Sequence, residues 1–303
     1  MSGIFSGLSK LGLYGIEGVE IFEKDEKNDF LEENARREQK KADKKKVVID
    51  EMDTIYDKTY ICPVCDIEFK SKTVMTGKAK LVSIDTDLRP RYQEVDCIKY
   101  DCVTCDNCGY SVLTRYFGSL SSSQIKSIKD NICDNFQGVE FGKNIYSYDD
   151  AITRYQLALA NSIVKHAKNS ERAYACLKLA WLYRGKAEHL DETEIDYDAW
   201  LEECKSEEKK YLANAYEGFK NAMQNEYFPI CGMDEPTLIY LIADLARRNK
   251  DYETSAKLIS QLIISKNTPT KVKERARDLK EIIRQEVKEG KSMEWLLYRY
   301  NGG

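Results

Sequence analysis

Hydrophobic and polar positions follow two different periods along the chain. Between Val47 and about Gly118, short runs such as "KTYICPVC" and "KAKLVSID" alternate apolar and polar residues between turn residues, which is typical of strands joined by hairpins. From Ser147 onward, long segments such as "DDAITRYQLALANSIVKHAK" repeat apolar residues every three to four positions, which is typical of helices. The pattern therefore predicts an α+β fold, with a small β-rich module followed by an all-α domain.

The same pattern, together with the charges, predicts five segments. We expect a short N-terminal element over residues 1–22 and a charged linker or helix over residues 23–50, where acidic residues are followed by basic ones. The β-rich module spans residues 51–120, a connector spans residues 121–148, and the helical domain spans residues 149–303.

Small and large residues alternate along the predicted helices with a spacing known from tetratricopeptide repeats. The order small, large, small at intervals of four and three residues occurs at Ala151, Tyr155 and Ala158 and again at Ala215, Phe219 and Ala222. Small residues let neighbouring helices approach, and large residues fill the gaps between them. We therefore predict a short, irregular tetratricopeptide-like array. An ordinary helical bundle is the alternative, because no two units are near copies of each other.

The composition disfavours several classes of protein. The 303 residues include 47 Lys and Arg against 51 Asp and Glu, a formal net charge of −4, so the chain has no overall field that attracts nucleic acid or an anionic membrane. It has no apolar run of about 18 residues, and its N-terminus lacks the pattern of a signal peptide. We therefore expect a cytoplasmic protein, whose ten cysteines are ligands, nucleophiles or packed thiols rather than disulfides.

Two cysteine pairs have the spacing of metal ligands. Cys62 and Cys65 form "CPVC", and Cys105 and Cys108 form "CDNC". Two residues between thiolates let a tight turn direct both sulfur atoms at one ion about 2.3 Å away, and Gly109 supplies the left-handed backbone that such a turn needs. The two pairs predict a zinc ribbon that holds one structural Zn²⁺.

Other interpretations of the cysteines stay open. An iron–sulfur cluster also takes four cysteines, and a thiol-redox pair uses the same spacing, although "CPVCDIEFKSK" continues as a strand rather than as the helix that a thioredoxin-like pair requires. Cys102 forms an overlapping pair with Cys105 in "CVTC", and Cys97 lies just upstream, so a ligand swap is an alternative. Gly109 favours the pairing of Cys105 with Cys108.

Three motifs and the helices after them resemble a bacterial family. The motifs "YDKTYICPVC", "SIDTDLRPRY" and "CDNCGYSVL" precede helices that contain "LAWLYR" and "YLIADLARRNKDYETSAKLI". In this order, over about residues 55–265, they resemble the family catalogued as domain of unknown function 2225, a cysteine-rich metal-binding module joined to tetratricopeptide-like helices. The resemblance implies that Cys62, Cys65, Cys105 and Cys108 are the metal-site cysteines. It implies no reaction.

The central motif, "DTDLRPRY", contains further candidate residues. Asp85 and Asp87 lie two positions apart in an extended segment, so their side chains point to the same face and can bind a cation or pair with an arginine. Together with Arg89 and Tyr92 they match the central motif of the family. We hypothesise that these four residues form a partner-binding edge of the ribbon. The alternative is a strand end and turn held by local ion pairs.

The sequence has no pattern typical of an enzyme. It lacks the phosphate-loop, dinucleotide and nucleophile-elbow motifs, and four cysteine ligands leave no open position on an ion. Residues 55–120 hold nine Lys and Arg against nine Asp and Glu, which disfavours a phosphate-binding surface. We therefore predict a non-catalytic, zinc-binding adaptor or scaffold that binds a protein partner through its helical repeats and ribbon. The alternative is a nucleic-acid-binding or thiol-redox regulatory protein that acts through the cysteine module.

Overall fold

The computed structural model describes residues 50–118 and 120–300. The predicted N-terminal element at residues 1–22 and all but the last residue of the predicted linker at residues 23–50 lie outside the described residues. The described residues belong to one compact unit, Ile49–Gly303, in which β-hairpins precede a series of helices. The predicted α+β class is therefore confirmed, whereas the five predicted segment boundaries stay predictions.

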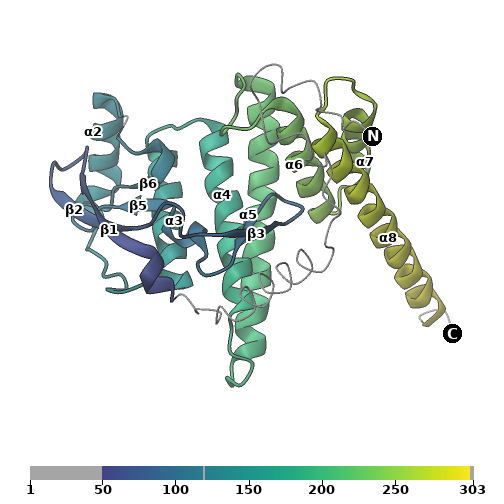
Figure 1. The fold of residues 1–303 in the computed structure, drawn as a ribbon, viewed down its shortest axis with the longest axis horizontal. Coiled ribbons are helices and arrows are strands. Elements are labelled where there is room, and N and C mark those ends of the chain that lie inside the picture. Colours follow the sequence, from purple (N-terminus) through teal and green to yellow (C-terminus); the bar gives the residue numbers. More distant parts are fainter. Residues whose placement is uncertain (1–49, 119, 301–303) are drawn as a thin grey trace, which may run out of the picture. The chain divides into compact units, whose positions relative to one another are not determined.

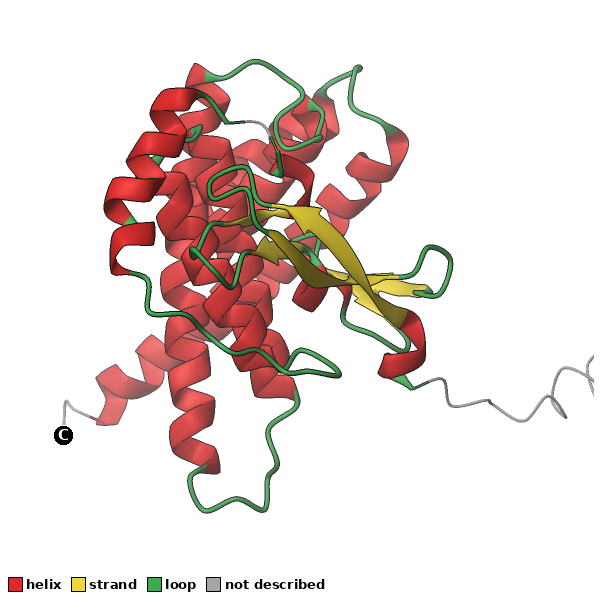
Figure 2. Cartoon of the chain, turned by 90° about the vertical axis from the view of Figure 1, so that its left-hand side faces the viewer, coloured by secondary structure: helices red, strands yellow, loops and turns green. Residues whose placement is uncertain are grey.

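Six short strands form three separate antiparallel hairpins. They are β1 (Ile55–Ile61) with β2 (Glu68–Val74), β3 (Leu81–Ile84) with β4 (Pro90–Tyr92), and β5 (Cys102–Thr104) with β6 (Ser111–Leu113). Figure 2 shows the strands lying against the helices. A two-stranded hairpin is at best marginally stable alone, so each of these hairpins depends on its neighbours and on the helices for burial.

Within the described residues, seven α-helices follow the strands. Their bounds are α2 (Ser122–Asn131), α3 (Tyr148–Val164), α4 (Asn169–Glu188), α5 (Tyr197–Asn225), α6 (Glu235–Arg248), α7 (Tyr252–Ile264) and α8 (Thr270–Tyr300). From α3 to α8 each helix packs against the next one along the chain, as Figure 1 shows. Helix starts follow from capping: Ser147 accepts a hydrogen bond from the Asp150 backbone N–H, and Asp234 accepts one from Thr237. Among the helices that the structure describes, none is long and apolar enough to cross a membrane.

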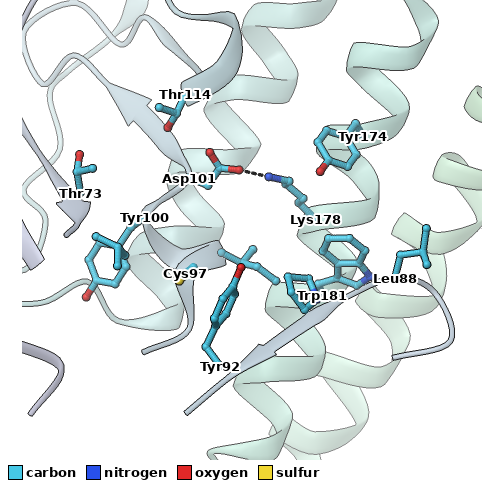
Figure 3. A pocket seen from close by; sticks show the side chains of 13 residues that line it. Thr73, Leu88, Tyr92, Cys97, Tyr100, Asp101, Thr114, Tyr174, Lys178 and Trp181 are labelled. Atoms are coloured by element: carbon cyan, nitrogen blue, oxygen red, sulfur yellow. Dashed lines mark hydrogen bonds and ion pairs between the residues drawn. The ribbon is translucent and has the colours of Figure 1, made fainter. Parts of the chain in front are cut away.

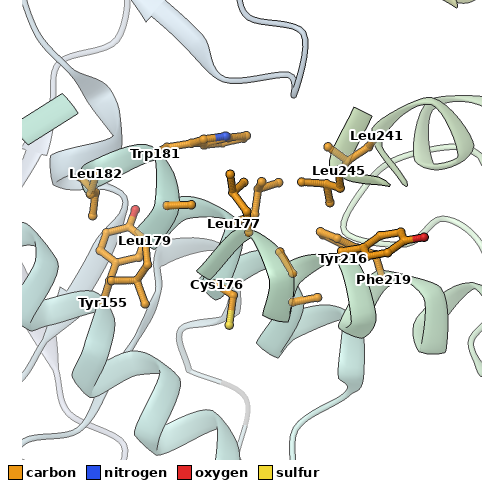
Figure 4. Close-up of a cluster of buried hydrophobic side chains, with 14 of the residues drawn as sticks. Tyr155, Cys176, Leu177, Leu179, Trp181, Leu182, Tyr216, Phe219, Leu241 and Leu245 are labelled. Carbon is orange, nitrogen blue, oxygen red and sulfur yellow. The ribbon is translucent and has the colours of Figure 1, made fainter. Parts of the chain in front are cut away.

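Helix α4 lies in the centre of the helical core. Its Leu177, Leu179 and Leu182 are all almost completely buried although they point to different sides of the helix, which is expected for a helix covered all round. Figure 4 shows Tyr155 of α3 and Phe219 of α5 packed on either side of it. The predicted small, large, small positions at Ala151, Tyr155 and Ala158 and at Ala215, Phe219 and Ala222 are all buried. Their burial fits close helix packing, and the tetratricopeptide assignment stays a prediction.

Hydrogen bonds from α3 attach the β-hairpins to the helical core. Arg154 is 1% exposed, and its guanidinium donates to the carbonyl oxygen of Cys102 and, at 2.8 Å, to Ser71 Oγ. At the next position of α3, the Tyr155 hydroxyl donates to the carbonyl oxygen of Ile98 at 2.8 Å. A buried guanidinium needs several acceptors, and the backbone of β5 and a side chain of β2 supply two of them. The position of the β-hairpins on α3 is thereby fixed.

Candidate metal centre

The two cysteine pairs meet at one point. The Sγ atoms of Cys62, Cys65, Cys105 and Cys108 all lie within 4.8 Å of one another, with 3.6 Å between Cys62 and Cys108 and 3.7 Å between Cys65 and Cys105. Four thiolates arranged as a tetrahedron 2.3 Å from a central ion have sulfur atoms about 3.8 Å apart. These distances are too long for a disulfide, and all ten cysteines are free. The four thiols can therefore hold a metal ion.

Each cysteine pair sits on a turn with the same backbone geometry. The N–H of Asp66 donates to the carbonyl oxygen of Cys62 at 2.9 Å, and the N–H of Gly109 donates to that of Cys105 at 3.0 Å. Asp66 has φ +60° and Gly109 has φ +74°, so both residues after the pairs adopt the left-handed conformation that the sequence predicts for Gly109. Aspartate is among the side chains that tolerate this region. Two equivalent turns thus aim their thiols at a common point.

The thiol cluster forms part of the core of the β module. Cys62 and Cys105 are fully buried, Cys108 is 5% exposed, and Cys65 is half-buried. Apolar and aromatic side chains surround them, among them Tyr60, Val64, Phe69, Tyr110, Val112 and Ile128. An ion bound here is shielded from solvent on most sides. Its bonds to sulfur connect hairpins that have little other core of their own.

The proximity of the thiols changes their acidity when no ion is bound. Hydrogen bonds from the Cys108 and Cys62 thiols lower the pKa of Cys105 to about 2. The Cys105 thiolate in turn raises the pKa of Cys62 to about 12 and raises the pKa of Cys108 as well. Cys105 therefore ionises first, while Cys62 and Cys108 retain their protons. A metal ion that takes up all four thiolates must displace those protons.

The structure separates Cys97 and Cys102 from the cluster. Among the described residues, the group of thiols that can share an ion contains neither of them. Cys102 lies in β5 on the face toward α3, where its Sγ is 3.4 Å from Ser111 Oγ and 3.5 Å from the carbonyl oxygen of Arg154. Strand alternation turns Cys102 toward α3. Of the overlapping "CVTC" pair, Cys105 therefore belongs to the thiol cluster and Cys102 does not.

Three residues close to the cluster carry no signal in the sequence. Cys133, which follows α2, packs against the cluster, and the Phe136 ring covers Gly109 so closely that an added Cβ would lie 2.7 Å from it. Asn161 of α3 donates to the carbonyl oxygen of Gly109 at 3.0 Å. All three lie more than twenty positions from the nearest cysteine pair. Only tertiary packing brings them to the site.

The central motif lies in a network of ion pairs between the β3–β4 hairpin and the helices. Asp87 is fully buried and Arg89 is 2% exposed. Asp87 pairs with Arg184 of α4 at 2.5 Å, and Arg89 pairs with Asp96 at 3.1 Å. Asp85 accepts hydrogen bonds from Arg91, as the sequence allows, and from Arg184. Asp85 and Asp87 are therefore both paired with arginines. Partner binding by Asp85, Asp87, Arg89 and Tyr92 stays a prediction, with Asp87 and Arg89 turned inward.

Comparison with known proteins gives a family without a described activity. No curated protein and no solved structure significantly matches the chain. A family model described as "Uncharacterized protein conserved in bacteria (DUF2225)" matches residues 55–283. The matched residues contain both cysteine turns, the central motif, the helices α2 to α7 and the start of α8 as far as Ile283. Because the match covers well over half of the chain, the protein belongs to this bacterial family.

Proposed function

We propose that this protein is a non-catalytic, zinc-stabilised adaptor of the cytoplasm that binds a protein partner. The observation that carries the zinc assignment is the four-thiol cluster of Cys62, Cys65, Cys105 and Cys108. Four thiolates complete a tetrahedral shell, so no position is left for a substrate or for an activated water. The free state of all ten cysteines supports a reducing compartment.

The spacing of the sulfur atoms favours zinc over an iron–sulfur cluster. With all four within 4.8 Å of one another, the centre has room for a single ion. A cluster of several irons and sulfides would hold its cysteine sulfurs farther apart. Zn²⁺ is the ion that proteins most often place in closed four-cysteine sites. The metal in this proposal has a structural role, because it joins the β1–β2 hairpin to the β5–β6 hairpin.

A groove on the helical domain is the surface that we assign to the partner. It lies among α3, α4 and α5 and has a volume of about 360 Å³. Its walls include Leu159 and the half-exposed Ile163, and polar side chains at its rim include Arg172, Asn214 and Glu217. An apolar floor with a polar rim suits a peptide segment of another protein with an apolar anchor. The balanced charges of the β module make nucleic acid a poorer candidate.

The first step of the test is to capture partners from a lysate of the source bacterium with the tagged, zinc-loaded chain, with and without nuclease. In the second step, each captured partner is purified and its affinity is measured by direct titration. The variant carries Ile163→Glu and Arg172→Glu. Its matched control is Lys205→Glu, an exposed position of α5 outside the groove. We expect a nuclease-resistant partner whose affinity falls at least tenfold in the groove variant and is unchanged in the control. Recovery of nucleic acid alone, or a partner insensitive to the groove, would reject this assignment.

A further inference from the structure

A second cavity lies between the β-hairpins and α4, separate from the thiol cluster and from the helical groove. Its volume is about 430 Å³, within the range of small-molecule sites. The side chains around it are mostly aromatic or apolar and include Leu88, Tyr92, Ile98, Tyr100, Tyr174 and Trp181. They come from the β3–β4 hairpin, from the 3₁₀ turn Cys97–Tyr100 and from α4. Packing of the hairpins on the helices therefore creates the cavity.

One ion pair interrupts this apolar wall. Figure 3 shows Lys178 extending from α4 toward Asp101, and its ammonium donates a hydrogen bond to the Asp101 carboxylate. The Lys178 side chain is 6% exposed and that of Asp101 is 38% exposed. Burial opposes the charge of Lys178, but the Asp101 carboxylate outweighs it, and the pKa of Lys178 is raised. The cavity therefore presents a fixed positive and a fixed negative group side by side.

The Lys178 ammonium has spare hydrogen-bonding capacity. An ammonium has three N–H donors, and within residues 50–118 and 120–300 Asp101 is the single acceptor that hydrogen-bonds to it. Nζ also lies 4.7 Å from the centre of the Tyr174 ring. This cation–π contact stabilises the charge but does not take up an N–H donor as a hydrogen-bond acceptor would. Buried donors without acceptors are costly. A carboxylate in the cavity would satisfy them.

The cavity has no group for covalent chemistry. The thiol on its wall is Cys97, and burial, together with the negative charge of Asp96, raises its pKa to about 12. This thiol is protonated at neutral pH and is therefore a poor nucleophile. The remaining polar groups of the lining side chains are hydroxyls, the indole N–H and the Lys178–Asp101 pair. The arrangement is suited to reversible binding.

We propose that this cavity binds a free α-amino acid with an apolar or aromatic side chain. The carboxylate of the ligand accepts hydrogen bonds from Lys178, its ammonium pairs with Asp101, and its side chain lies among Tyr92, Trp181 and their apolar neighbours. A zwitterion matches both charges of the wall and adds no net charge to the cavity. A ligand with a carboxylate alone places a second negative charge beside Asp101, and an amine alone places a second positive charge beside Lys178.

Trp181 provides the readout, because it lines the cavity. The full chain is prepared with zinc and with Trp200→Phe and Trp295→Phe, which leaves Trp181 as the single tryptophan among the three in the chain. Its emission is titrated with L-phenylalanine, with 3-phenylpropionate, which lacks the ammonium, and with 2-phenylethylamine, which lacks the carboxylate. We expect a saturable change with L-phenylalanine and at least tenfold weaker binding of both analogues. No saturable change with L-phenylalanine, or equal binding of one analogue, would overturn the proposal.

Variants of the ion pair complete the test. Lys178→Met should weaken the binding of L-phenylalanine at least tenfold. The control is Lys186→Met on the same helix, whose ammonium pairs with Asp149 at 2.6 Å outside the cavity, and it should change the affinity less than twofold. If Lys178→Met does not fold, Asp101→Asn takes its place, because Asp101 is more exposed than Lys178. Equal affinity in the cavity variant and the control would refute the site. This readout needs no protein partner, so it is independent of the adaptor proposal.

Discussion

Arg184 Nη2 donates a 2.5 Å hydrogen bond to Asp87 Oδ2, although the two residues are 97 positions apart in the sequence. Asp87 is fully buried in the turn between β3 and β4. The same guanidinium contacts Asp85 at 3.1 Å and Glu208 of α5 at 2.7 Å. Arg248 of α6 lies 3.6 Å from Asp87 on the other side. The turn of the central motif therefore connects one hairpin to three helices through charges.

Asp87→Asn should destabilise the protein by about 2–3 kcal/mol, because it removes the closest counter-charge of Arg184, which keeps Asp85 and Glu208 as partners. The measurement is urea denaturation of the zinc-loaded protein. Asp149→Asn is the matched control, since Asp149 is also paired, with Lys186, but is 71% exposed. Exposed pairs contribute about 1 kcal/mol or less. Equal losses in the two variants would mean that the central motif does not hold the helices together.

The same carboxylate predicts a pH dependence at low pH. Burial opposes the charge of Asp87, but Arg184 and Arg248 outweigh it and lower its pKa from 3.8 to about 2. Asp87 therefore contributes stability that is present above pH 3.8 and is lost as the pH falls through about 2. The contribution is about 2 kcal/mol.

The difference in unfolding free energy between the wild type and Asp87→Asn isolates this contribution, because the effects of groups that titrate alike in both proteins cancel. We expect a constant difference above about pH 4 and a shrinking one below it. A difference that does not change with pH would contradict the assigned charge of Asp87.

The cysteine turns were predictable from sequence because their geometry is local. In each turn, the four residues of the C-x-x-C motif and the residue that follows it decide where the two thiols point. The spacing of the cysteines and the presence of Gly109 were therefore enough to predict the turns. The choice between Cys102 and Cys108 was harder, because both complete a C-x-x-C with Cys105. Only the strand register, which places Cys102 opposite Leu113 and against α3, decides it.

The surroundings of the motifs were not predictable in the same way. The partner of Asp87 is one arginine among many in the helical half, and no sequence spacing selects Arg184. The amino-acid cavity combines Lys178 with Asp101, 77 positions apart, so it exists only after the hairpins pack on α4. Long-range pairs of this kind depend on tertiary packing, which neither propensity nor periodicity encodes.

Gly109→Ala should cost more stability than Gly77→Ala. Both glycines have positive φ, +74° and +81°, so both substitutions carry the penalty of about 1–2 kcal/mol for a left-handed residue. Only at Gly109 does the new Cβ meet another group, the Phe136 ring at 2.7 Å, whereas nothing lies within 4 Å at Gly77. The clash should add about 1–3 kcal/mol.

Thermal or urea unfolding of the zinc-loaded variants measures this difference. Phe136→Leu in the Gly109→Ala background should recover most of the added loss, because it removes the ring that the new methyl group meets. If Gly109→Ala and Gly77→Ala cost the same, the Phe136 ring moves aside freely and does not constrain the turn.

The metal content of two cysteine variants distinguishes the alternative ligand sets. Cys105→Ser should lose the bound ion and unfold the β module, since it removes one of four converging thiolates. Cys102→Ser should keep one ion per chain, because Cys102 faces Ser111 and the backbone of α3. Elemental analysis of the purified proteins gives both the identity and the number of the ions. An ion lost from Cys102→Ser but kept in Cys105→Ser would reverse the assignment.

Cys97 should react slowly with alkylating agents while the protein is folded. Burial and Asp96 raise its pKa from the ordinary 9.0 to about 12, so at pH 8 the reactive thiolate is about 1,000-fold less populated than for an unperturbed thiol. Mass spectrometry after iodoacetamide treatment of the zinc-loaded protein measures the rate, and the same protein unfolded in guanidinium with a chelator gives the reference. A thiol-redox regulator needs a reactive thiol with a low pKa. If Cys97 of the folded protein is labelled as fast as in the unfolded protein, the result would favour a thiol-redox regulator over a structural role for the cysteine module.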